Sequence, residues 1–276
     1  MGRRAAYGDS AHGAGGRALS APKALLFRSF LPKGVWWGTL TLATFVLGGA
    51  SQLSAQVPVD GEVRQLVTFR FLPGMAAEAN ALYRAHAIPL YEQDEAMLSF
   101  RALREVESPV PLDLIVISSF QGMAGMDESN AALRRLAEAS GSSIGAIYGN
   151  IGQFTESHHD QFVEMLAPMI NGDPSAKRLV TLVWYRVLPG EASSFERALE
   201  MDIVPWERRR GVPTSTGRFL VSDGWSYLRF LGFDSLADYQ AYWTELGAEA
   251  SHRTVEEVTA LRREVILAPV PELSVR

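Results

Sequence analysis

One short pattern occurs twice in this sequence at a fixed spacing. The residues FRFLPG at 69–74 recur as YRVLPG at 185–190, and IPLYE at 88–92 recurs as VPWER at 204–208, so both matches lie 116 positions apart (185 − 69 = 204 − 88 = 116). Self-similarity at one offset is the mark of an internal duplication. We therefore expect the chain to fold as two copies of one structural unit.

The segment that follows the repeated Pro-Gly turn has the same apolar stripe in both copies. In the second copy the stripe is spaced by four, four and three positions, which is one face of a helix. Its members are Phe195, Leu199, Ile203 and Trp206, and moving back 116 positions gives Ala79, Tyr83, Ala87 and Leu90. The helix is thus repeated along with the turn.

Each copy has the predicted element order βαββαβ. Alternating β-branched residues before Pro-Gly indicate the first strand, and Asp223-Gly224 indicates a tight hairpin between the two middle strands of the second copy. In the first copy we expect strands at 64–72, 97–106, 112–120 and 150–158 and helices at 76–87 and 126–139. In the second copy we expect strands at 180–187, 216–222, 225–233 and 263–273, a helix that carries the stripe from Phe195 to Trp206, and a helix from Ser235 whose apolar face is Leu236, Tyr239, Trp243 and Leu246.

This order predicts an α+β fold with two ferredoxin-like βαββαβ units, at 62–160 and 177–273, joined by a linker at 161–176. The strand VTLVWYRV (180–187) carries large side chains on both faces, so a single unit would leave one sheet face in water. We expect the two sheets to pack face to face as an intramolecular dimeric α/β barrel. A monomer follows from that arrangement.

The second copy resembles the dimeric α/β-barrel superfamily, and within it the NIPSNAP-like proteins. The resemblance rests on YRVLPG, VPWERRRG and GRFLVSDGWSYLRFLGFDSLADYQAYW, which cover about 175–272, and it extends more loosely to 64–160. It implies a ferredoxin-like fold in a superfamily that includes cofactor-free and haem-degrading monooxygenases, dismutase-like haem enzymes, isomerases and proteins without assigned chemistry. The activity is left open by the resemblance.

The first 55 residues have the composition of a secretory signal peptide. They contain six basic residues and one acidic residue, and the 16 uncharged residues at 35–50 are followed by SQLSAQ, which offers small residues to a signal peptidase. We predict cleavage after Ala55 and a periplasmic or secreted protein, the alternative being an uncleaved membrane anchor. The absence of cysteine is compatible with an oxidising compartment.

The charge balance after residue 55 argues against nucleic acid as a partner. Subtracting six basic residues and one acidic residue from totals of 26 and 31 leaves 20 basic and 30 acidic residues, a balance of −10. Such a chain repels phosphate backbones and anionic lipid. Partners are expected to be a small organic ligand or another extracytoplasmic protein.

A ligand pocket is predicted inside the barrel from two arginines. Trp184 and Arg186 share one face of their strand, and Tyr227 and Arg229 share one face of theirs. If these strands are neighbours, the arginines converge and require a counter-charge, such as an acidic or oxygen-rich ligand flanked by Trp184, Trp225 and Tyr227. The alternative is that each arginine pairs with a carboxylate at the end of the barrel.

The first copy matches this pocket only in part. Arg70 corresponds to Arg186, but Val116 stands where the second copy has Arg229. The pocket is therefore expected to be biased toward the second copy, with Arg70 as its single contribution from the first.

The histidines and the ERRRG run provide few candidates for catalysis, metal binding or anion binding. His86 is a candidate acid/base or haem ligand, with a structural histidine as the alternative, while His252 beside Arg253 is expected on the surface. His158-His159-Asp160 is interpreted as solvated linker, since adjacent side chains diverge and chelate one ion poorly. Glu207 in ERRRG is expected on a solvated edge. No metal and no cofactor is predicted.

These patterns favour an exported protein that binds a small organic ligand or a protein partner. The alternative is a cofactor-free or haem-dependent monooxygenase-like or isomerase-like enzyme, with Arg186 and Arg229 holding an anionic intermediate. No Gly-rich phosphate loop, G-x-S-x-G elbow or H-E-x-x-H motif is present, so nucleotide binding, serine hydrolysis of that type and zinc proteolysis have no support.

Overall fold

The computed structural model describes residues 61–107 and 113–275, so the predicted signal peptide at 1–55 lies outside the described residues. The described chain is an α+β structure with eight strands in one sheet. These are β1 (Glu62–Phe71), β2 (Met97–Glu107), β3 (Leu114–Gln121), β4 (Thr155–Asn171), β5 (Leu179–Val187), β6 (Thr214–Val221), β7 (Tyr227–Phe233) and β8 (Thr259–Pro269).

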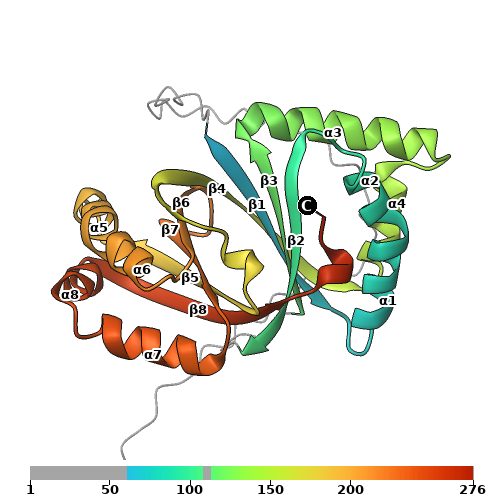
Figure 1. Cartoon of the computed structure of the whole chain (residues 1–276). Helices are drawn as coiled ribbons and strands as arrows, with labels where there is room; N and C mark the ends of the chain where they lie inside the picture. The colour runs from blue at the N-terminus through green and yellow to red at the C-terminus, as the bar shows by residue number, and fades with distance from the viewer. Residues whose placement is uncertain (1–60, 108–112, 276) are drawn as a thin grey trace, which may run out of the picture. The chain divides into compact units, whose positions relative to one another are not determined.

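The sheet is a closed antiparallel barrel in the order β1-β3-β2-β8-β5-β7-β6-β4 (Figure 1). Strand β1 pairs with β3 and β4, and β5 pairs with β7 and β8. Pairing of β2 with β8 and of β4 with β6 closes the ring. This arrangement is consistent with a dimeric α/β-barrel-like fold.

Helices cover the outside of the barrel. Those after β1 and β3 are α1 (Ala76–Leu82), α2 (Ile88–Tyr91), α3 (Gly122–Ala139) and α4 (Ile144–Gly152). Those after β5 and β7 are α5 (Ala192–Ala198), α6 (Val204–Arg209), α7 (Leu236–Leu246) and α8 (Ala250–Glu257), and Figure 1 places them on the other side of the barrel. No helix within 61–107 and 113–275 is long and apolar enough to cross a bilayer.

The first helix of each half contains a π-helical turn, at Tyr83–Ala87 and at Leu199–Ile203. Pro89 and Pro205 follow these turns inside helical runs that have no break, so each proline removes a hydrogen bond from the interior of its helix. The two turns start 116 positions apart (199 − 83 = 116). The predicted apolar stripe of the second half is buried, with Phe195 and Leu199 at 0% exposure.

Three apolar clusters hold the fold together. The barrel interior is filled by side chains such as Leu66, Ile115, Leu182 and Leu228. Two further clusters lie between the sheet and its helices, one for α1–α4 and one for α5–α8. Strand β5 therefore buries apolar surface on both faces, with Leu182 and Trp184 in the barrel interior and Val183 and Tyr185 under the helices.

The predicted linker at 161–176 is wrong. Strand β4 occupies 17 residues from Thr155 to Asn171, pairing first with β1 and then, from Phe162 onward, with β6. The strand expected at 150–158 also starts later, because α4 extends to Gly152. Apolar and polar residues do not alternate clearly in MLAPMIN (165–171), so the sequence does not identify the second half of β4 as a strand.

Strands β4 and β6 approach closely at Gly217. A Cβ atom at this position would lie 2.3 Å from Val163 Cγ1 and 2.7 Å from the Glu164 carbonyl oxygen. The register between β4 and β6 is also irregular between Met165 and Ile170. Only glycine fits at 217 without moving the neighbouring strand.

Candidate functional site

Three of the predicted pocket residues lie at one end of the barrel. Trp184 points into the barrel core, where its indole Nε1 donates to Gln161 Oε1 at 3.1 Å. Arg186, two residues along the same face, is exposed and donates from Nε to the Gly224 carbonyl oxygen at 2.9 Å. Its guanidinium carbon stands 5.4 Å from the ring centre of Trp225.

Arg229 and Tyr227 lie on the opposite face of the sheet, so the prediction that Arg186 and Arg229 converge inside the barrel is wrong. The register pairs Val183 with Arg229 and Trp184 with Leu228, which puts Arg229 on the side of the helices. Strand faces alternate with a period of two, so a slip of one residue exchanges the inner and outer sets.

Tyr227 packs in the cluster between the sheet and α5–α8. Its hydroxyl donates to Glu196 Oε1 at 2.6 Å. Burial, followed by this hydrogen bond, raises the pKa of Tyr227 to about 12. The side chain is therefore a packed phenol outside the barrel interior and does not form a wall there.

Arg229 belongs to a buried polar cluster built around Glu207. Arg229 Nη2 donates to both carboxylate oxygens of Glu207, at 2.7 and 2.8 Å, and the two side chains are 1% and 0% exposed. Glu207 also accepts from Thr214 Oγ1 at 2.9 Å and from the Tyr242 hydroxyl at 2.5 Å. Although burial lowers the pKa of Arg229, the Glu207 charge holds it above the ordinary value.

Two sequence interpretations meet in this cluster. The expectation that Glu207 lies on a solvated edge is wrong, because α6 directs it inward toward the sheet. The alternative interpretation of the arginines, a pairing with a carboxylate, describes Arg229. One sequence signal could have revealed the pair. Both charged residues are absent from the first half, where Tyr91 and Val116 stand at the corresponding positions (207 − 116 = 91; 229 − 113 = 116).

The remaining sequence candidates from the first half do not join a common site. Arg70 is half exposed and pairs with Glu156 at 2.8 Å. His86 is exposed on the π-helical turn. His158 and His159 lie on β4, where they face Asp160 at 3.6 Å and Asp223 at 3.1 Å. Across the described residues, no group of three or more His, Asp or Glu side chains is arranged to hold a metal ion.

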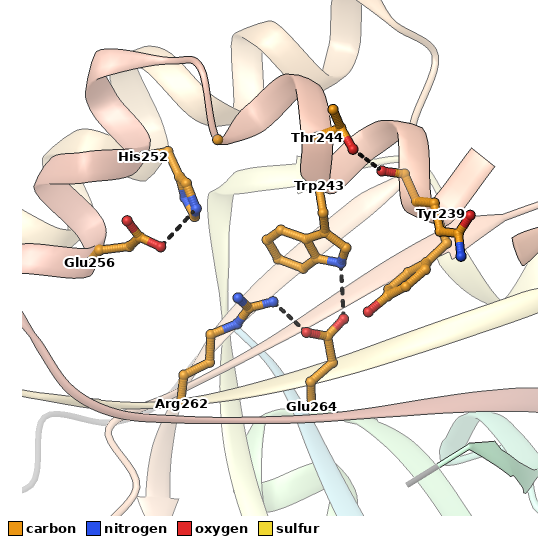
Figure 2. Close-up of a pocket in the computed structure, with 9 residues that line it drawn as sticks. Tyr239, Trp243, Thr244, His252, Glu256, Arg262 and Glu264 are labelled. Atoms are coloured by element: carbon orange, nitrogen blue, oxygen red, sulfur yellow. Dashed lines mark hydrogen bonds and ion pairs between the residues drawn. The ribbon is translucent and has the colours of Figure 1, made fainter. Parts of the chain in front are cut away.

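A pocket of about 590 Å³ lies outside the barrel, between α7, α8 and the outer face of β8 (Figure 2). It is a shallow hollow that is broadly open to solvent. The side chains that give it chemical character are Tyr239, Trp243, His252, Glu256, Arg262 and Glu264.

The pocket walls are tied together around Trp243 (Figure 2). Its indole Nε1 donates to Glu264 Oε1 at 3.0 Å, and the Arg262 guanidinium lies 3.9 Å from its ring centre. Arg262 also pairs with Glu264. The floor of the pocket is thus an arginine and a carboxylate of β8 that fix the indole of α7.

His252 closes the α8 side of the pocket. Its side chain is 8% exposed, and Nε2 lies 3.3 Å from Glu256 Oε1, one helical turn away. Burial lowers the pKa of His252, Glu256 opposes this effect, and the charges of Arg262 and Arg229 reinforce it. With a neutral imidazole, the formal charges of Glu256, Glu264 and Arg262 leave one negative charge in excess.

The sequence reasoning missed this pocket. The stripe containing Tyr239 and Trp243 was interpreted as helix core, and His252 was expected on the surface, whereas the structure buries it. Two local signals were available. His252 and Glu256 are four residues apart on a helix, and Arg262 and Glu264 are two apart on a strand, so each pair shares a face.

Comparisons with known proteins identify the fold. A candidate monooxygenase from Lactobacillus acidophilus matches with a TM-score of 0.55 and 9% identity, covering 78% of this chain and 96% of its own. An anthrone oxidase-like protein matches with a TM-score of 0.54 and 12% identity, covering 78% and 94%. A variant of chlorite dismutase from Candidatus Nitrospira defluvii matches with a TM-score of 0.52 and 11% identity, covering 78% and 94%.

No protein-family model matches the sequence, and no curated protein is detectably similar to it. The structural matches share the dimeric α/β-barrel architecture with this chain, and at 9–12% identity they carry information on the fold alone.

Proposed function

We propose that this chain is an exported tandem α/β-barrel protein, related to the NIPSNAP-like group, that binds a small organic ligand in the pocket between α7, α8 and β8. The duplication is supported by the strand orders β4-β1-β3-β2 and β8-β5-β7-β6, each of which is that of a ferredoxin-like unit. Equivalent pairs also recur, since Phe71 faces Thr155 and Val187 faces Thr259. The offset falls from 116 for the first strand to 104 for the last (187 − 71; 259 − 155).

The observation that carries the ligand proposal is a hollow with an aromatic wall and an unbalanced carboxylate. Trp243 and Tyr239 supply ring surface, and Gln240 and Thr244 supply hydrogen-bonding groups. Arg262 is matched by Glu264, whereas Glu256 faces a histidine whose burial favours the neutral form. This set suits a planar ligand that is neutral or cationic and carries hydrogen-bond donors.

Three probes of one shape and different charge test this chemistry. Benzamidine, benzamide and benzoate are titrated into the purified protein while the indole N–H signal of Trp243 is followed by NMR. We expect benzamidine to bind best and benzoate worst. Replacement Trp243→Phe assigns the signal, and no shift of it with benzamidine at millimolar concentration would contradict the proposal.

A matched pair of variants on α8 tests the role of the carboxylate. Glu256→Gln should reduce the preference for benzamidine over benzamide about two- to fivefold, the range expected for an exposed charge. Glu257→Gln removes the same charge one residue away, outside the pocket lining, and should leave the preference unchanged. Equal effects of the two variants would mean that the net charge of α8 sets the preference, and would contradict a contact between the ligand and Glu256.

A second candidate function is a cofactor-free enzyme that uses His252 as a base. When Nε2–H is donated to Glu256, Nδ1 keeps the lone pair that proton abstraction needs. A haem does not fit this pocket, because its walls carry the carboxylates of Glu256 and Glu264 and His252 directs Nε2 at the first of them. Base-catalysed ring opening of 5-nitrobenzisoxazole tests the candidate, since it reports any reactive base in a hollow. A rate that exceeds buffer and is lost in His252→Gln would favour the enzyme.

Export and a monomeric state belong to the same proposal. Export is supported by the composition of residues 1–55, and a monomer by the β2–β8 and β4–β6 pairs that close the barrel within one polypeptide. Expression of the full chain in a bacterial host should yield a periplasmic protein that starts at Gln56 and has the mass of one polypeptide by light scattering. A dimer would contradict the monomeric state, and a protein retained in the membrane would contradict cleavage and export.

A further inference from the structure

A second hollow lies in the first half of the chain, between α3 and the loop that joins α2 to β2. It is an open groove of about 750 Å³. The loop residues 93–96 form one wall. The other wall is a stripe of α3 at helical spacing, made of Glu128, Ala131, Ala132, Arg135, Leu136 and Ala139. The groove shares no residue with the pocket between α7, α8 and β8.

The corresponding positions of the second half hold an arginine side chain. The Arg210 guanidinium pairs with Glu245 at 2.8 Å and lies 3.9 Å from the ring centre of Trp206. Trp206 in turn donates its indole N–H to Glu249 at 2.7 Å. At the offsets of the sequence repeat, the counterparts of Arg210, Glu245 and Glu249 all line the groove, as Asp94, Ala132 and Leu136 (210 − 116 = 94; 245 − 113 = 132; 249 − 113 = 136).

The first half has an aspartate in place of this arginine. Asp94 is fully buried, and its carboxylate accepts from the Ala96 backbone N–H at 3.0 Å and from the Ser129 hydroxyl. Both donors are neutral, so neither contact offsets the charge of a carboxylate. Alanine at 132 and leucine at 136 leave an apolar floor where the second half carries two carboxylates. The first half therefore has room for an arginine side chain that its own sequence does not supply.

The charges around the groove favour a cation. Glu95 on the loop and Glu128 on α3 are exposed on opposite walls, and Arg135 is the cation of the lining. With Asp94, three carboxylates stand against one guanidinium, a formal excess of two negative charges (3 − 1 = 2). An excess of one remains when the buried Asp94 is left out. A negative rim over an apolar floor matches a side chain that has a cationic head and an apolar stem.

The groove is longer than one side chain. Helix α3 advances eleven residues from Glu128 to Ala139 (139 − 128 = 11). At about 1.5 Å per residue this is about 16 Å, a distance that about five residues of extended chain cover. A small cation would leave most of this length empty, whereas a segment of a protein fills it.

We propose that this groove docks an extended segment of a partner protein through an arginine side chain. Glu95 and Glu128 attract the guanidinium, and its apolar stem contacts Ala132 and Leu136. Arg135 opposes the binding. Arginine is among the side chains that most often anchor protein interfaces. This surface is independent of the pocket between α7, α8 and β8, so its failure would leave the proposed ligand binding untouched.

Peptides of one length and different charge test the docking. The probe is acetyl-Ala-Leu-Arg-Leu-Ala-amide, and two matched peptides carry citrulline or glutamate in place of arginine. Each is titrated into the purified protein while the methyl signals of Ala131, Ala132 and Leu136 are followed by NMR. The arginine peptide should shift these signals and bind about three- to tenfold more tightly than the citrulline peptide, as expected for two exposed carboxylates, and the glutamate peptide should bind worst.

Two outcomes of these titrations would overturn the proposal. Equal affinity for the arginine and citrulline peptides, or no shift with either at millimolar concentration, would exclude recognition of the charge. Agmatine carries a guanidinium without a peptide and should bind more weakly than the arginine peptide. Agmatine that binds as tightly would identify the groove as a site for a small cation.

Two charge variants on the groove face of α3 should act in opposite directions. Glu128→Gln should weaken binding of the arginine peptide about two- to fivefold, and Arg135→Gln should tighten it by a similar factor because a repulsion is removed. The controls Glu138→Gln and Arg134→Gln change the same charges at exposed α3 positions outside the groove and should leave the affinity unchanged. Ala132→Glu supplies the carboxylate that the second half has at this position and should tighten binding. Effects no larger than those of the controls would overturn the assignment.

Discussion

The buried pair of Glu207 and Arg229 makes a sharp prediction about stability. Replacing Glu207 by leucine leaves the Arg229 charge in a site that is 1% exposed, and replacing Arg229 by methionine leaves the Glu207 carboxylate in a site that is 0% exposed. Each single replacement removes a counter-charge without removing the charge itself. The double replacement removes both charges and leaves only hydroxyl groups without partners, Thr214 and Tyr242 without their acceptor and Thr216 without its donor.

The magnitudes follow from the contacts. Breaking a buried ion pair from one side costs about 3–5 kcal/mol, so the two single variants would sum to roughly 6–10 kcal/mol. The double variant leaves the hydroxyls of Thr214 and Tyr242 without the Glu207 oxygens. At about 1–2 kcal/mol for each unmet donor, the double variant should lose roughly 2–4 kcal/mol, far below the sum.

Urea unfolding followed by tryptophan fluorescence measures these free energies, with thermal unfolding as a second probe. A single variant should lower the melting temperature by roughly 6–20 °C, at about 2–4 °C per kcal/mol for a domain of this size. The control is Glu245→Gln, which breaks the half-exposed pair with Arg210 at 2.8 Å and should cost less than about 1 kcal/mol. Additive losses in the double variant, or a loss in Glu207→Leu no larger than in the control, would refute the reasoning.

Three further outcomes are expected. Gly217→Ala should destabilise the protein by about 1–3 kcal/mol because the new Cβ clashes with β4. Gly149→Ala, with no atom within 4 Å of the new Cβ, should stabilise it by up to about 1 kcal/mol. Equal unfolding midpoints for the two variants would contradict this reasoning. Burial lowers the pKa of His252 below 6.5, so the contribution of this residue to stability is complete above pH about 6.5 and is lost as the pH falls toward the folded-state pKa. In His252→Gln, the unfolding midpoint should therefore fall less steeply on the acid side. An unchanged slope would contradict this linkage. Residues 56–171 alone should aggregate or dimerise because the inner face of β1–β4 is then wet, and a stable monomer by light scattering would contradict the sheet-to-sheet packing.

The βαββαβ order within each half was predictable from sequence because it depends on local periodicity, whereas the extra helices α4 and α8 before the last strands were not predicted. The helical spacing of Phe195, Leu199, Ile203 and Trp206 marks a face that any helix here must bury, and these side chains are buried in the cluster under α5–α8. Apolar residues in both registers of β5 likewise indicated a sheet covered on both sides, and Trp184 and Tyr185 are buried on opposite faces. The unit boundaries were less accurate where alternation is weak, as in the second half of β4.

The composition of the site could not be read from sequence because it depends on strand register and on partners distant in the chain. Arg229 looked equivalent to Arg186 until the pairing with Val183 put it on the helix side, a difference of one residue in register. Glu207 in a run of arginines looked solvated, since nothing local reveals that its counter-charge lies 22 residues away on strand β7. The candidate pocket combines α7, α8 and β8, so only the packing of these elements brings Trp243, His252 and Glu264 around one hollow. Sequence by itself thus determined which apolar side chains must be buried. The tertiary structure decided which polar side chains are buried among them, because a buried charge is stable only beside a partner that the fold supplies.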